Sequence, residues 1–92
     1  MTRDEVLAWL GSRRPAPPPA LRERLTRAVK HQIPAPGSRL PTYLAQVGQS
    51  LLDSVAGKPN GGRELALDLL AADAFATYAF EAQAEEGSLH ET

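Results

Sequence analysis

Apolar residues recur along the chain at intervals of three and four, the spacing that places them on one face of an α-helix. The first such stretch covers residues 2–11, with its apolar positions at Val6, Leu7, Trp9 and Leu10. Thr2 and Glu5 have the spacing of a capping box, in which a hydroxyl and a carboxylate satisfy the first backbone N–H groups. The pattern therefore predicts a short helix that begins at Thr2 and ends at Gly11.

Two further stretches of this kind predict helices over residues 19–32 and from about Pro41 to Val55. The apolar face of the first consists of Leu21, Leu25, Ala28 and Val29. The apolar face of the second consists of Leu40, Leu44, Val47, Leu51 and Val55. Gly48 lies inside the second pattern, where glycine costs about 1 kcal/mol relative to alanine. We expect this glycine to allow another helix to approach closely.

The last and longest predicted helix, residues 63–85, is apolar on more than one side. At about 100° per residue, one face carries Leu65, Leu69, Ala72, Ala76 and Phe80. A second face carries Leu67, Leu70, Ala74 and Tyr78. A helix that is apolar nearly all round is either central in its domain or covered by a partner.

Proline and glycine separate the predicted helices. Residues 12–19 contain four prolines, which favour an extended and stiff spacer. Residues 57–62 have the composition of a turn, and the polar residues 86–92 are expected to form a flexible acidic tail. With 92 residues and no internal repeat, the chain fits a single helical domain, residues 1–92.

The predicted fold class is therefore all-α, a small bundle of three to four helices with the C-terminal helix longest and central. Residue usage agrees with this class, because fifteen alanines and thirteen leucines stand against four valines and one isoleucine. Alanine and leucine favour helices, whereas β-branched residues favour strands.

Charge is unevenly distributed along the chain, although the net charge is only −1. Residues 1–63 hold all ten lysines and arginines and four acids, a net +6, whereas residues 64–92 hold seven acids and neither lysine nor arginine, a net −7. We expect the helices over residues 19–32 and 63–85 to pack as neighbours, so that these charges offset one another. The alternative is a basic arm and an acidic tail with separate partners.

The polar face of the helix predicted over residues 19–32 is basic. Its candidate phosphate contacts are Arg22, Arg24, Arg27 and Lys30. Surfaces that bind nucleic acid usually add a reading element or a stacking aromatic residue to such cations. This helix has no aromatic residue, and Glu23 interrupts the basic run. Weak nucleic-acid binding is therefore the alternative function, and a solvated helix face is the simpler interpretation.

The sequence contains no arrangement that is typical of a catalytic, cofactor or metal site. There is no cysteine, and neither His31 nor His90 belongs to a His-x-x-x-His or Glu-x-x-His pair. The segment around Gly48 lacks the second glycine of a nucleophile elbow. We therefore expect no enzymatic activity, no cofactor and no bound metal.

The surplus apolar surface of residues 63–85 favours a non-enzymatic interaction domain that binds a protein partner or forms a homo-oligomer. The candidate partner contacts are Leu67, Leu70, Phe75 and Tyr78, since aromatic residues are enriched where interfaces are strongest. The alternative is that the other helices enclose these side chains.

Asp73 also lies among apolar residues of this helix. We expect it to be exposed, because a buried carboxylate would need a pairing arginine.

Two features bear on where the protein acts. No apolar run approaches the roughly 20 residues that a membrane span needs. The first residues include Asp4 and Glu5, where a secretion signal would be basic. The expected location is therefore the cytoplasm, without membrane attachment.

Overall fold

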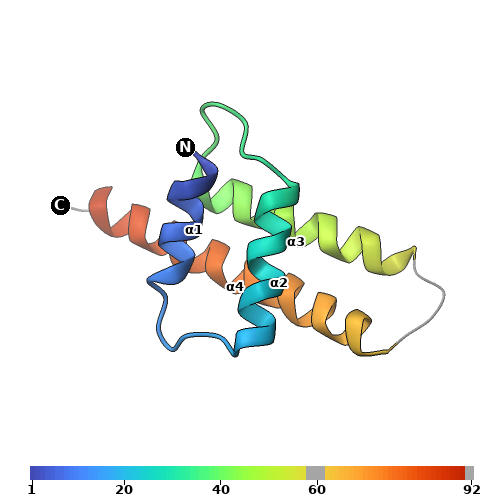
Figure 1. Ribbon diagram of the computed structural model, residues 1–92. Helices are drawn as coiled ribbons and strands as arrows, with labels where there is room; N and C mark the ends of the chain where they lie inside the picture. Colours follow the sequence, from blue (N-terminus) through green and yellow to red (C-terminus); the bar gives the residue numbers. More distant parts are fainter. Residues whose placement is uncertain (58–61, 91–92) are drawn as a thin grey trace.

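The computed structural model describes residues 1–57 and 62–90, and these residues form four α-helices and no strand. The helices, shown in Figure 1, are α1 (Arg3–Gly11), α2 (Pro19–His31), α3 (Leu40–Ala56) and α4 (Arg63–His90). The all-α prediction is confirmed, and α4 is the longest helix, as predicted.

Local sequence signals account for where α1, α2 and α3 begin. The predicted capping box of α1 is present: the Thr2 hydroxyl accepts from the backbone N–H of Glu5, and the Glu5 carboxylate accepts from that of Thr2, both at 3.2 Å. Prolines occupy the first turns of α2 and α3, where a missing N–H removes no intrahelical hydrogen bond. Residues 12–18 connect α1 to α2 without helix, as the prolines predict.

The C-terminal segment differs from the prediction, because α4 does not end at Glu85 but continues to His90. Residues 86–90, expected in a flexible tail, are therefore helical. An ion pair between Arg39 and Glu86 holds this end of α4 against the start of α3. Residues 91–92 of the predicted tail and residues 58–61 of the predicted turn lie outside the described part of the chain, as does the side chain of His90.

The helices form two layers (Figure 1). In one layer α3 and α4 run antiparallel, side by side; in the other, α1 and α2 lie across one face of this pair. Gly48 explains how closely α3 and α4 approach, since a Cβ added there would lie 3.2 Å from the Cβ of Phe75 and 3.3 Å from the carbonyl oxygen of Ala72. Both contacts are tighter than ordinary van der Waals packing, so the position suits glycine.

The core lies between the two layers. Its most deeply buried large side chains are Val6 of α1, Val29 of α2, Tyr43, Leu44 and Val47 of α3, and Phe75 of α4. Tyr43 donates a hydrogen bond from its hydroxyl to the carbonyl of Gln32, just beyond α2, and burial raises its pKa. Since α4 contacts α3 along its length, α2 through Asp68 and α1 through Glu85, it holds the central position predicted for it.

Candidate interaction surface

Helix α4 has two apolar faces, and the fold encloses only one of them. The enclosed face carries Ala71, Phe75 and Ala82, with exposed fractions of 2% or less. The stripe predicted from Leu65 to Phe80 is turned largely toward solvent: Leu69 is 44% exposed and Phe80 is 79% exposed. Most of this second apolar face therefore remains available after the domain has folded.

The second face borders a hollow of about 490 Å³ between α3 and α4. Helix α3 contributes Pro41, Thr42, Ala45, Gly48, Gln49 and Leu52. Helix α4 contributes Ala72, Ala76, Ala79, Phe80 and Gln83. None of these residues belongs to α1 or α2, which lie across the other side of the pair (Figure 1). We call this set of residues the α3–α4 face.

The α3–α4 face has a low centre and two raised ends. Small residues, Gly48, Ala72 and Ala76, form the centre, where the two helices are closest. Leu52 follows Gly48 by one turn of α3, and Phe80 follows Ala76 by one turn of α4. Because the helices are antiparallel, Leu52 and Phe80 lie at opposite ends of the face, with 45% and 79% of their surfaces exposed.

The four predicted partner contacts do not form one surface. Phe75 is fully buried in the core, so the structure does not offer it to a partner. Tyr78 and Leu67 are half-buried on the side of α4 that meets α1 and α2. Leu70 is 57% exposed but does not line the hollow. The sequence indicated the correct helix, whereas the exposed surface consists of other residues.

The missed signal was present in the sequence. The stripe containing Leu69, Ala76 and Phe80 is apolar in the sequence, but helical periodicity does not show that this stripe is the exposed one. Ala45 and Gly48, the small residues of α3 that line the hollow, have no sequence feature that assigns them to this surface. Only the pairing of α3 with α4 brings the two sets together.

The carboxylate that the fold encloses is Asp68, which is 3% exposed, whereas Asp73 is exposed as expected. The Nε atom of Arg24 lies 2.5 Å from Asp68 Oδ1 in a partly buried ion pair. Arg24, a candidate phosphate contact, is therefore engaged in an ion pair within the domain.

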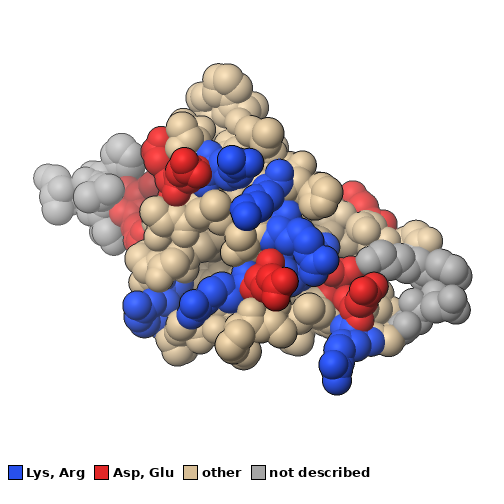
Figure 2. Space-filling model, viewed as in Figure 1, with Lys and Arg blue, Asp and Glu red and all other residues tan. Residues whose placement is uncertain are grey.

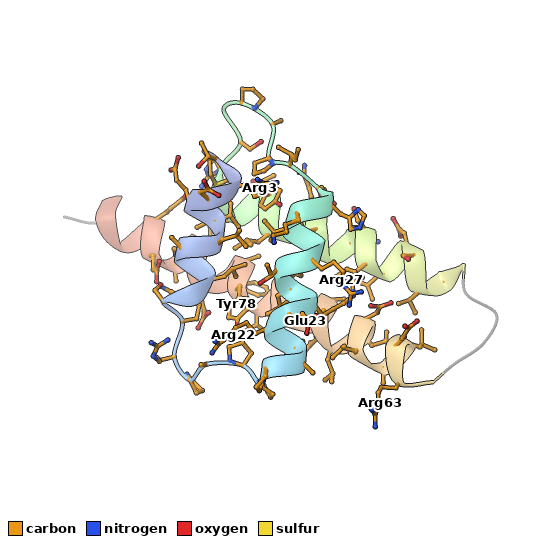
Figure 3. All side chains as sticks on the ribbon, in the orientation of Figure 1. Arg3, Arg22, Glu23, Arg27, Arg63 and Tyr78 are labelled. Atoms are coloured by element: carbon orange, nitrogen blue, oxygen red, sulfur yellow. The ribbon has the colours of Figure 1, made fainter. Side chains whose placement is uncertain are left out.

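The remaining candidate phosphate contacts, Arg22, Arg27 and Lys30, are exposed. Figure 3 shows Glu23 between Arg22 and Arg27 on α2, and Figure 2 shows acidic side chains among the basic ones on this side of the molecule. The outer surface of α2 is thus mixed in charge, and among its described residues it presents no stacking aromatic side chain.

A cluster around Trp9 attaches α1 to α4. The indole N–H donates to Glu85 Oε1 at 3.0 Å, and Arg13 Nη1 lies 2.6 Å from Glu85 Oε2. The Arg13 guanidinium carbon lies 4.0 Å from the Trp9 ring centroid, and the Tyr78 ring meets Trp9 edge to face at 6.0 Å. Hydrogen bonds from Arg13 and then Trp9 lower the pKa of Glu85. Burial, and secondarily the charge of Glu81, raise the pKa of Tyr78, while Arg13 acts in the opposite direction.

Three ion pairs connect the basic part of the chain to acidic residues of α4. Arg13, Arg24 and Arg39, all from the basic part of the chain, pair with Glu85, Asp68 and Glu86, all on α4. The expectation that the two parts offset each other within the domain is confirmed for α2 and α4 by the Arg24–Asp68 pair.

The described residues contain no group of three or more histidine and acidic side chains that could hold a metal ion. Within the same residues, every helix is too short or too polar to cross a lipid bilayer. Comparisons with protein-family models, with curated proteins and with solved structures find no match for this chain.

Proposed function

We propose that this chain is a non-enzymatic protein-interaction domain and that it docks its partner on the α3–α4 face. The observation that carries the proposal is the exposure of large apolar side chains at both ends of that face, above all Phe80 at 79%. A cytoplasmic location, expected from the sequence, remains a prediction.

Energetics supports this choice of surface. Burying a phenylalanine or leucine side chain contributes about 1.5–3 kcal/mol each. Phe80 and Leu52 leave much of that contribution unused in the isolated chain, although both lie beside a hollow. Single exposed apolar residues are common on protein surfaces, but a contiguous apolar patch is typical of a binding site.

The basic surface of α2 supports the alternative, weak binding of nucleic acid, less well. Arg24 already pairs with Asp68, and Glu23 lies between two of the remaining cations. Phosphate contacts made by so few free cations would give weak binding that falls steeply with salt.

Affinity capture with matched variants tests the proposal. The immobilised wild-type chain is compared with Phe80→Ser and with Ile33→Ser; Ile33 is 70% exposed but lies between α2 and α3, outside the α3–α4 face. We expect a protein, or the chain itself, to be retained by the wild type and by Ile33→Ser and to be lost with Phe80→Ser. Equal retention by all three, or retention by none, would contradict the proposal.

A further inference from the structure

We infer that the occupant of the α3–α4 face is a second copy of this chain, related to the first by a two-fold axis that passes close to Gly48 and Ala76. The inference rests on the proposed function, because it names the occupant of the same face. The two α3–α4 pairs then pack face to face as a four-helix bundle, and α1 and α2 of each copy lie on the outside.

The shape of the face is self-complementary. In a two-fold contact, a residue at one end of the face meets the residue at the other end in the second copy, and the reverse contact follows by symmetry. Phe80 and Leu52 lie at opposite ends of the low centre. An axis that lies in the contact plane and crosses the line from Leu52 to Phe80 at right angles near Gly48 brings Phe80 of each copy onto Leu52 of the other. The small residues between them let the helices approach.

The charge of the face also favours a second copy. Its lining includes no lysine, arginine, aspartate or glutamate, and its polar members, Thr42, Gln49 and Gln83, are uncharged. A two-fold contact sets a patch against itself, so an ionised group near the axis would meet its own like charge, which is destabilising. A partner of opposite charge would instead require ionised residues on the face, and its lining provides none.

The size of the face is enough for a modest dimer. Helix α3 has 17 residues, which gives a length of about 25 Å, and two packed helices are roughly 20 Å wide. The face therefore spans about 500 Å² in projection, at the small end of stable interfaces, which bury about 800 Å² per partner. We expect a dimer that dissociates in the micromolar range, on the order of 10–100 µM.

Sedimentation velocity over a range of concentrations tests the inference. The wild-type chain is expected to shift from monomer to dimer as the concentration rises, equally at low and at high salt, because the contact is apolar. Phe80→Asp is expected to stay monomeric with unchanged helicity, since this side chain is exposed in the monomer. Ile33→Asp, an equally drastic change at an exposed site outside the face, is expected to dimerise like the wild type.

Cross-linking locates the contact. Because the sequence has no cysteine, a single introduced cysteine reacts alone with a short-armed bis-maleimide. Ala76→Cys, near the proposed axis, is expected to give a covalent dimer in high yield. Ala66→Cys is the control: it is exposed on the same helix but lies outside the face, so the same residue in the second copy is far away. Efficient cross-linking through Ala66 and not Ala76 would overturn the inference.

The two proposals fail in different ways. A wild-type chain that remains monomeric at every concentration overturns the second-copy inference. If Phe80→Ser then still abolishes capture of another protein, the α3–α4 face remains a docking surface with a different occupant. If neither self-association nor any Phe80-dependent capture is found, both proposals are wrong.

Discussion

Asp68 is the carboxylate whose environment matters most at the scale of single residues. Only 3% of its surface is exposed, and Arg24 donates to it from α2 at 2.5 Å. Moving a carboxylate away from water costs several kcal/mol, about as much as its pairing returns. The pair therefore fixes how α2 crosses α4 more than it adds net stability, because a shifted α2 would leave the carboxylate without this donor.

Removing Arg24 is predicted to be far more costly than removing a neighbouring arginine. We expect Arg24→Ala to lower the free energy of unfolding by about 2–4 kcal/mol, because the enclosed Asp68 loses the ion pair and hydrogen bond that Arg24 supplies. Arg27→Ala, on the exposed side of the same helix, is expected to change it by less than about 0.5 kcal/mol. Urea unfolding followed by circular dichroism measures both; equal losses would contradict this role for the Arg24–Asp68 pair.

The sequence alone could not distinguish Asp68 from Asp73. Both acids lie among leucines and alanines on a helix with two apolar faces, so helical periodicity allows either face to be the enclosed one. The choice depends on where α2 and α3 pack. In the structure Asp68 shares the core face with Ala71 and Phe75, which also explains why Phe75 is buried within the domain.

At the scale of elements, Glu85 is the centre of the polar contacts that join the end of α1 to α4, in addition to the packing of Val6 in the core. This side chain accepts from Trp9 and Arg13, and both hydrogen bonds lower its pKa. A carboxyl group whose pKa is lower in the folded state stabilises that state above its ordinary pKa. The stabilisation is lost as the pH falls through the lowered value. Since half of the Glu85 side chain is exposed, solvent limits the effect to about 1 kcal/mol or less.

Acid is therefore predicted to loosen α1 before it unfolds the other helices. The single tryptophan, Trp9, reports this step: its fluorescence emission should shift to longer wavelength with a midpoint below the ordinary glutamate value of 4.5. Helicity measured by circular dichroism should persist at the start of the shift. Glu85→Gln removes the titrating group and is expected to abolish this transition. An unchanged transition in the variant would show that Glu85 is not its cause.

The close contact of α3 and α4 leads to a prediction for the stability of a Gly48 variant. Alanine normally gains about 1 kcal/mol over glycine in a helix. At Gly48, however, the new Cβ would press on the Cβ of Phe75 and the carbonyl of Ala72, and neither is the movable end of a side chain. We expect Gly48→Ala to destabilise the domain by about 1 kcal/mol, within the range for overpacking.

Gly87 is the matched control, because it lies in α4 and an added Cβ there meets nothing within 4 Å. Gly87→Ala is expected to leave stability unchanged or to raise it by a few tenths of a kcal/mol, roughly what propensity allows near a helix end. Thermal unfolding of both variants compares them directly. A stabilising Gly48→Ala would mean that α3 and α4 are not held together as closely as described.

The helices themselves were predictable from local signals, and their misjudged limits have tertiary causes. Two helix starts are marked by local signals that do not depend on tertiary contacts: the capping box of Thr2 and Glu5, and the proline at position 19. The sequence pattern predicts too early an end for α4, because residues 86–90 are mostly polar and resemble a tail. The structure extends the helix through them with support from Arg39, a contact that sequence periodicity does not contain.

At the scale of the whole molecule, the two-layer arrangement covers one face of the α3–α4 pair and leaves the other face uncovered. Helices α1 and α2 cover one face of the α3–α4 pair, and α2 carries exposed arginine and lysine side chains on that side (Figures 1 and 2). The hollow on the opposite face is lined by apolar residues and uncharged polar residues. The sequence predicted surplus apolar surface on the last helix, but which side remains open follows only from how α1 and α2 pack across the pair.

The central claim is that the α3–α4 face is where this protein meets a second copy of itself. Backbone amide NMR spectra of the labelled chain, recorded from about 10 µM to about 1 mM to span the expected dissociation constants, test it most directly. We predict concentration-dependent shifts at Ala45, Gln49, Leu52, Ala76 and Phe80, with little change on the outer surface of α2. Shifts confined to α2, or spectra that do not change with concentration, would contradict the claim.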